Sequence, residues 1–151
     1  MKINVRVNMA GKKEVFDPVR KKYVVLTPEE EVRQYFIAFL QEQCLVPLGS
    51  ISVERDLKLY KRSFRTDIKV YNKKGQGVML VECKRPSVKL DDTVKVQISK
   101  YHLAGKERYL VITNGMEFLA WEVEEKKEGE EGQKTKALEK IPVWEELNNG
   151  N

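Results

Sequence analysis

The sequence predicts a single α/β domain in which α-helices flank a mixed β-sheet. Segments with strand-like alternation follow one another between Ile51 and Lys84. A helix-like segment then separates the apolar run at Val78–Lys84 from a second apolar run at Arg108–Thr113. A strand, a helix and a strand in this order favour a right-handed parallel crossover, so we expect a sheet with both strand directions.

The length and composition fit one globular domain. We expect residues 1–151 to form a single unit with an arm or short strands over 1–26, a core over 27–123, and a charged loop with a C-terminal cover over 124–151. Hydrophobic residues make up 41% and charged residues 34%, which is typical of a soluble protein. The chain contains no apolar run long enough to span a membrane and no recognisable signal peptide. Its two cysteines are too few for a disulfide framework, so we expect a cytoplasmic location without membrane attachment.

The first helix has a strong start signal. Thr27 is a suitable N-cap, Pro28 suits the first helical position, and Glu30 lies where a capping box places its acid. We expect the helix to run to about Gln43, with Arg33 on a different side from its apolar stripe. The stripe comprises Val32, Tyr35, Phe36, Phe39 and Leu40.

The residues after this helix predict an antiparallel meander. Period-two alternation marks strands at Ile51–Glu54, Leu57–Tyr60 and Asp67–Tyr71. A polar turn over Asn72–Gly77 leads into the most apolar strand, Val78–Lys84, which we expect at the centre of the sheet.

The remaining elements follow from caps, turns and apolar runs. We expect a helix over Thr93–Ala104, strands over Arg108–Thr113 and Glu117–Val123 with a turn at Asn114-Gly115, a mobile charged loop over Glu124–Lys136, an edge cover at Ile141–Trp144, and a frayed tail over Asn148–Asn151.

The end of the central strand carries the candidate chemistry. Side chains alternate along a strand, so Glu82 and Lys84 lie on one face and Cys83 on the other. Asp67 begins the neighbouring strand, which brings a second carboxylate to the same region. Two carboxylates beside a lysine predict a site for a divalent metal ion.

Oxygen ligands are those that Mg²⁺ prefers, usually one or two carboxylates with water and phosphate completing the shell. Asp67 and Glu82 supply two of them in this hypothesis, and the Cys83 backbone carbonyl supplies a third. Lys84 then orients a water molecule or offsets the charge that builds on a phosphodiester. Gln97 reaches the site from the second helix, and Tyr101 packs behind it or contacts phosphate.

Each of these residues also has a structural interpretation. Glu82 and Lys84 fit a surface ion pair at a strand end, and Asp67 fits a turn cap. Gln97 and Tyr101 fit a helix face that meets the sheet. The occurrence of all these residues together, with an acid at the start of one strand and Glu-x-Lys at the end of the next, favours the metal site.

The charge distribution is compatible with a phosphate backbone as partner. The net charge is +5, and eight basic residues lie between Arg55 and Lys74 against two acidic ones. The alternative is a hairpin kept soluble by its lysines. Lys61, Arg62, Arg65 and Arg85 are the candidate nucleic-acid contacts.

Five ordered segments resemble a known family. Asp67 with Glu82-Cys83-Lys84 is similar to the Asp…Glu-x-Lys signature of the restriction-endonuclease-like, or PD-(D/E)xK, nuclease superfamily. More narrowly, the chain resembles the N-terminal domain of type I restriction enzyme R subunits between about Thr27 and Trp121. The segments are Arg65–Ile68, Val81–Ser87, Thr27–Gln34, Gln97–Tyr101 and Leu110–Gly115.

The resemblance implies a restriction-endonuclease-like core, αβββαβ, with an added C-terminal strand or hairpin. It implies Asp67 and Glu82 as metal ligands, Lys84 as the catalytic lysine, and Gln97 and Tyr101 as the motif on the following helix. Glu30 is the expected assisting glutamate of the first helix, with Glu29 and Glu31 as alternatives, and Glu54 lies where family members often carry a further acid.

The implied function is a Mg²⁺-dependent deoxyribonuclease, for which Mn²⁺ can substitute. The expected partners are DNA and other restriction-modification subunits or a second copy in a homodimer. A full R subunit also carries an ATP-driven motor, and this chain lacks the Gly-x-x-x-x-Gly-Lys-Ser/Thr loop of such motors. The alternative is a catalytically silent nucleic-acid-binding or partner-docking module of the same fold.

Overall fold

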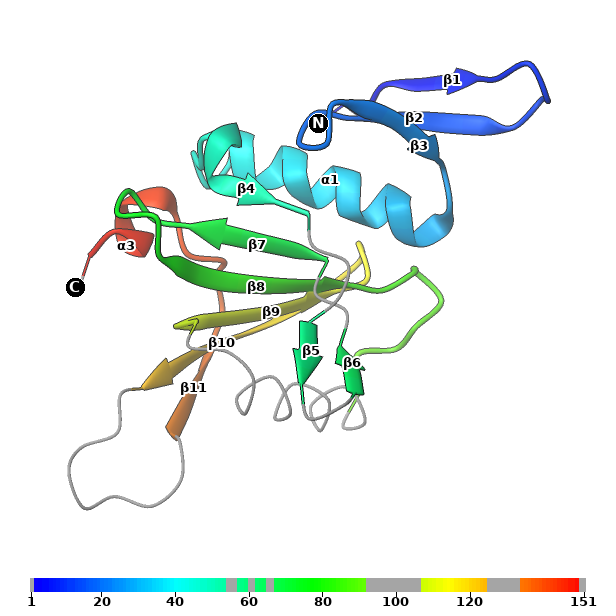
Figure 1. Cartoon of the computed structure of the whole chain (residues 1–151). Helices are drawn as coiled ribbons and strands as arrows, with labels where there is room; N and C mark the ends of the chain where they lie inside the picture. Colours follow the sequence, from blue (N-terminus) through cyan, green and yellow to red (C-terminus); the bar gives the residue numbers. More distant parts are fainter. Residues whose placement is uncertain are drawn as a thin grey trace.

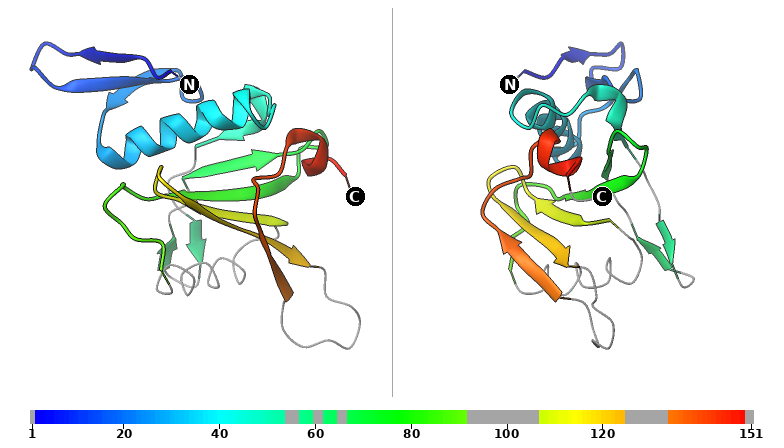
Figure 2. Two further views of the ribbon diagram at one scale, coloured as in Figure 1. Left: turned by 180° about the vertical axis from the view of Figure 1, so that it is seen from behind. Right: turned by 90° about the vertical axis from the view of Figure 1, so that its left-hand side faces the viewer.

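The architecture is known from a computed structural model, which describes residues 2–53, 57–59, 62–64, 67–91, 107–124 and 134–149. The described residues form a six-stranded mixed sheet with strand order β11-β10-β9-β8-β7-β4. Helix α1 packs on one face of this sheet, and a three-stranded sheet lies on the far side of α1 (Figures 1 and 2). The α/β class is thereby confirmed, and the more specific restriction-endonuclease-like core stays a prediction.

Strand β8 lies at the centre of the main sheet. It pairs antiparallel with β7 and parallel with β9, and the parallel pairing confirms the expected sheet with both strand directions. Of its seven residues, five are buried, because helix α1 covers one face and apolar side chains cover the other. The strands of this sheet are β4 (Ile51–Ser52), β7 (Ile68–Tyr71), β8 (Gly77–Cys83), β9 (Tyr109–Thr113), β10 (Phe118–Glu124) and β11 (Lys134–Leu138).

Helix α1 (Pro28–Glu42) begins at the predicted residue. The Thr27 hydroxyl accepts a hydrogen bond from the Glu30 N–H at 3.0 Å, and Gln43 is the C-cap. The capping box is only half formed, because the Glu30 carboxylate bonds to two arginines instead of the Thr27 backbone.

The buried face of α1 differs from the expected stripe. Tyr35 is 39% exposed, whereas Ile37, which the stripe omits, is 1% exposed. Arg33 was expected away from the apolar face, but its side chain is largely buried and contacts the sheet residue Asp67. The stripe was therefore wrong about Tyr35, Ile37 and Arg33.

Residues 5–25 form a sheet of their own. Strands β1 (Val5–Val7), β2 (Lys13–Asp17) and β3 (Lys22–Val25) pair antiparallel in sequence order. Asp17 ends β2, and its carboxylate accepts the N–H groups of Val19 and Arg20 in the turn that follows. Short polar side chains of this kind stabilise tight turns by such bonds.

The predicted continuous meander is wrong in one part. Strands β5 (Leu57–Leu59) and β6 (Arg62–Phe64) pair with each other in a separate two-stranded sheet. Strand β4, which follows a short 3₁₀ turn at Leu48–Ser50, instead pairs directly with β7. The predicted helix over Thr93–Ala104 lies outside the described residues.

The C-terminal residues are more ordered than expected. Strand β11, placed in the predicted loop, pairs along β10, while residues 125–133 lie outside the described part. Helix α3 (Trp144–Leu147) follows, and Ile141 and Leu147 both join the core. The expected fraying is wrong for Asn148, whose side chain accepts the Lys73 N–H at 2.7 Å.

The turn between β9 and β10 shows why the sheet fits closely under α1. Gly115 has a φ of +86°, and a Cβ added there would lie 3.2 Å from the Val32 side chain. Glycine tolerates both the positive φ and the close approach. Asn114 completes the predicted turn by accepting the N–H groups of Met116 and Glu117.

We predict that Leu40→Ala lowers the free energy of unfolding by about 2–5 kcal/mol, because Leu40 is fully buried between α1 and the sheet. Tyr35→Ala on the same helix is the control, with an expected loss below about 1 kcal/mol. Urea unfolding measures both. Equal losses would contradict the observed burial pattern of α1.

Candidate functional site

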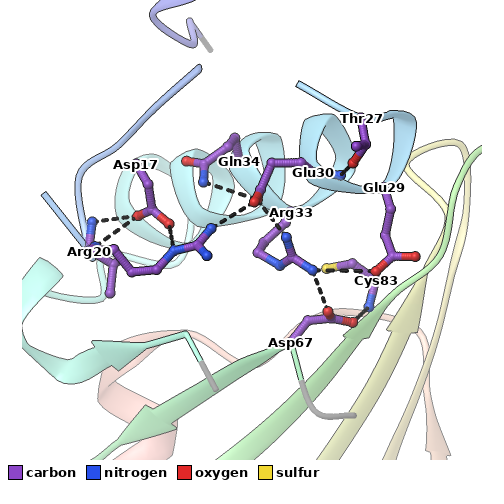
Figure 3. Close-up of polar contacts among 10 residues, drawn as sticks. Asp17, Arg20, Thr27, Glu29, Glu30, Arg33, Gln34, Asp67 and Cys83 are labelled. Carbon is purple, nitrogen blue, oxygen red and sulfur yellow. Dashed lines mark hydrogen bonds and ion pairs between the residues drawn. The ribbon is translucent and has the colours of Figure 1, made fainter. Parts of the chain in front are cut away.

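The ends of β7 and β8 bring the predicted acids to adjacent strands. Ile68 pairs with Val81, and the N–H of Asp67 donates to the Val81 carbonyl at 3.1 Å, so the register places Asp67 beside Glu82. Asp67 is only 4% exposed. Its Oδ2 accepts the backbone N–H of Cys83 at 2.7 Å, which ties the carboxylate to the residue between Glu82 and Lys84 (Figure 3).

The two faces of β8 have different chemistry. Cys83 belongs to the core cluster under α1, whereas Leu80 belongs to the cluster on the opposite face. By alternation Glu82 and Lys84 share the face of Leu80. The Lys84 Nζ lies 2.8 Å from the Glu82 Oε1, so the structure brings these two side chains together in an ion pair.

Arg33 connects Asp67 to helix α1. Its Nη2 donates to the Asp67 Oδ1 at 2.5 Å and lies 3.4 Å from the Glu29 Oε1. Its Nη1 lies 2.6 Å from the Glu30 Oε2. Burial lowers the pKa of Arg33, but the hydrogen bonds with Asp67 and Glu30 outweigh burial and the net pKa is raised. The guanidinium is therefore charged at every relevant pH.

The network continues from α1 into the N-terminal sheet. Arg20 donates to the Glu30 Oε1 at 2.7 Å and to the Asp17 Oδ2 at 2.5 Å, and Gln34 donates to the Glu30 Oε2 at 3.3 Å. Asp17 is fully buried. Figure 3 shows the resulting chain of alternating charges, Asp17–Arg20–Glu30–Arg33–Asp67, which we call the charge chain.

Sequence reasoning missed most of this chain. Glu29 and Glu30 lie four and three residues before Arg33, which are the spacings of ion pairs along a helix, so these two contacts could be predicted from the sequence. Arg20 and Asp17 carried no signal beyond an aspartate before a turn, and the pairing of Arg33 with Asp67 spans 34 residues.

The charge chain carries more negative than positive charge. The chain itself has three carboxylates and two guanidinium groups, and Glu29, which contacts Arg33 from outside the chain, adds a fourth carboxylate, so together two negative charges are in excess. Glu29 is the most exposed of the four and contributes least.

The remaining predicted residues are distributed as follows. Glu30 lies in the charge chain and Glu31 is exposed. Arg85 is exposed directly after β8, in a turn where the Val88 N–H donates to its carbonyl at 3.0 Å. Gln97, Tyr101, Glu54, Lys61, Arg65 and the side chain of Arg62 lie outside the described residues.

The donor types suit a hard divalent ion. No group of three or more His, Cys, Asp or Glu side chains placed to hold a metal occurs in the part of the chain that the structure describes. The expected ligands, however, are two carboxylates and one backbone carbonyl, which is within the range that Mg²⁺ uses. The excess negative charge beside Asp67 also fits a cation, so the residues present are compatible with one.

The chain is thus an α/β protein with a buried charge network at the end of its central strands. The family model for the Type I restriction enzyme R protein N terminus matches residues 28–142, and the chain belongs to this family. The match begins at the first residue of α1 and leaves out the three-stranded sheet. No curated protein and no solved structure matches the chain. None of the helices in the described ranges is long and apolar enough to cross a membrane.

We predict that Arg20→Met lowers the free energy of unfolding by roughly 3 kcal/mol, because it leaves the buried Asp17 and Glu30 carboxylates short of a countercharge. Arg6→Met is the matched control. Arg6 is half exposed, pairs with Glu14 and stacks on the Tyr23 ring, and its loss is expected to cost about 1 kcal/mol. Similar losses in urea unfolding would show that the charge chain adds no stability of its own.

A second prediction concerns Cys83. Burial raises the pKa of its thiol well above the usual value, and the nearby Asp67 charge raises it further. The unfolded thiol loses its proton near pH 8.5, whereas the folded thiol keeps it. The stabilising contribution is therefore complete below pH 8.5 and declines as the pH rises above it.

Urea unfolding between pH 7.5 and 10 measures this decline. Wild-type protein should lose more stability over the interval than Cys83→Ala, which has no thiol to titrate at this position. Cys44→Ala is a useful comparison, since burial raises the pKa of Cys44 to about 11. Parallel curves for wild type and Cys83→Ala would contradict the prediction.

Proposed function

We propose that the chain is a divalent-metal-dependent deoxyribonuclease domain that hydrolyses DNA phosphodiester bonds internally, as part of restriction-modification. The carrying observation is the hydrogen bond that the Cys83 N–H donates to the Asp67 carboxylate, which joins the two parts of the Asp…Glu-x-Lys pattern at adjacent strand ends. Membership of the R protein N-terminal family supports the same class of activity.

In this proposal Asp67, Glu82 and the Cys83 carbonyl hold Mg²⁺, or Mn²⁺ in its place. The ion would supply positive charge and Lewis acidity beside the scissile phosphate. The bond from Cys83 N–H fixes the orientation of the Asp67 carboxylate before substrate binds. This rigid placement lowers the reorganisation that the reaction requires.

Lys84 contributes a fixed positive charge. Its ammonium lies against Glu82, so both groups enter the site as an oriented pair. When the phosphate binds, the ammonium offsets the charge that builds on its oxygens in the transition state. Gln97 and Tyr101 remain proposed contributors from the following segment, and Arg85, Lys61, Arg62 and Arg65 remain proposed contacts to the DNA backbone.

The second candidate function is a silent DNA-binding or partner-docking module of the same fold, acting with other restriction-modification subunits or as a homodimer. One observation favours it. Arg33 already pairs with Asp67, and Lys84 already pairs with Glu82, so both acids have internal countercharges. A module of this kind would bind DNA in a salt-dependent way that survives loss of the two acids.

We predict that purified protein cleaves plasmid DNA in Mg²⁺ or Mn²⁺, and that Glu82→Ala and Lys84→Ala each reduce the cleavage rate at least about 100-fold. Matched controls remove the same charges from exposed positions outside the site, Glu117→Ala for the acid and Lys89→Ala for the lysine. Agarose gels with and without EDTA measure cleavage.

Equal cleavage by wild type and both site variants would identify a contaminating nuclease and reject the proposal. Absence of cleavage together with salt-dependent DNA binding that Asp67→Ala and Glu82→Ala leave intact would select the silent module. Single-stranded DNA and RNA substrates in the same assay define the substrate class.

A further inference from the structure

We infer that Arg33 sets the divalent-metal affinity of the site, because its guanidinium competes with the metal ion for the Oδ1 atom of Asp67. This inference rests on the proposed metal site at Asp67 and goes beyond it by assigning a role to a residue of α1. Three observations carry it, and they concern the placement of Asp67, the alternative partners of Arg33, and the local charge.

Asp67 keeps its place without Arg33. Its N–H donates to the Val81 carbonyl at 3.1 Å and its Oδ2 accepts the Cys83 N–H at 2.7 Å, so backbone bonds on both sides hold the residue. Arg33 contacts the other carboxylate oxygen, Oδ1. Removing the guanidinium therefore frees a ligand atom while the carboxylate stays oriented toward the strand end.

Arg33 also keeps partners when it releases Asp67. Its Nη1 is bonded to Glu30, and its Nη2, the atom that contacts Asp67, lies 3.4 Å from Glu29 as well. The Nε of Arg33 has no hydrogen-bond partner among the described residues, so the terminal nitrogens alone hold the group. A small rotation toward Glu29 would thus exchange one carboxylate for another without leaving the guanidinium unpaired.

The local charge gives the direction of the effect. The charge chain together with Glu29 has two negative charges in excess with Arg33 present, and three when Arg33 is neutralised. Attraction for a cation at Asp67 rises accordingly, since a positive charge a few ångströms away opposes the ion. Arg33 thereby keeps the metal affinity of the site low enough for the Asp67 carboxylate to exchange between the guanidinium and the metal ion.

The test uses Mn²⁺ alone, with free ion measured by electron paramagnetic resonance and binding heat by calorimetry. Arg33→Met should bind Mn²⁺ about tenfold more tightly than wild type, or better. Arg33→Lys keeps the charge but lacks the fork that reaches Glu30 and Asp67 together, so its affinity should lie between the two. Arg6→Met, which removes an equal charge outside the charge chain, should bind as wild type does.

Thermal unfolding provides a second readout. Without metal, Arg33→Met should melt below wild type, because the Glu30 and Asp67 carboxylates lose a countercharge. Saturating Mn²⁺ should then raise its melting temperature by more than it raises that of wild type. If Arg33→Met does not fold, Arg33→Lys carries the test, and affinity equal to or weaker than wild type would overturn the inference.

The outcomes separate this inference from the proposed function. Weaker Mn²⁺ binding by Arg33→Met would show that Arg33 positions Asp67, and the competition would be rejected. Unchanged Mn²⁺ binding by Asp67→Asn would reject the metal site itself, and the inference with it. Asp67-dependent Mn²⁺ binding that tightens in Arg33→Met, in a protein that cuts no DNA, would reject the nuclease alone.

Discussion

The charge chain from Asp17 to Asp67 connects all three layers of the molecule. It starts in the turn of the N-terminal sheet, passes through the buried side of α1, and ends at the main sheet. Charged groups lose hydration when they are buried, and only close pairing and full hydrogen bonding repay that cost. The position of α1 over the sheet is therefore constrained by these ion pairs as well as by apolar packing.

This constraint has a direct consequence for the candidate site. The body of the sheet separates two environments, with Cys83 in the apolar core below α1 and the Glu82–Lys84 pair on the other face. Charged side chains on opposite faces of the sheet can approach one another only at the strand ends, where backbone N–H and C=O groups are no longer paired within the sheet. Asp67 lies at that end, bonded both to α1 and to the backbone of β8. The site residues thus depend on a strand terminus that the charge chain holds in place.

Local sequence patterns predicted those parts of the fold that depend on local physics. The cap at Thr27, the apolar run of β8 and the turn at Asn114 each follow from bonds or packing within a few residues. The role of Arg33 does not follow from local patterns. A hydrophobic stripe assigns charged residues to the solvent and cannot detect a carboxylate 34 residues away. Strand β11 was missed for a related reason. Its composition is that of a loop, and its order comes from pairing with β10.

The N-terminal sheet affects the candidate site although it lies outside the family match. Arg20, which precedes the matched region, shares Glu30 with Arg33. Glu30 therefore pairs with two guanidinium groups, and its single negative charge cannot neutralise both of them. Because Arg20 balances part of the Glu30 charge, Arg33 retains attraction for Asp67. Without Arg20, the full charge of Glu30 would act on Arg33 alone and draw it toward the helix. The balance of charge at Asp67 is thus adjusted by a residue two layers away, through three ion pairs (Arg20–Glu30, Glu30–Arg33 and Arg33–Asp67) and no direct contact.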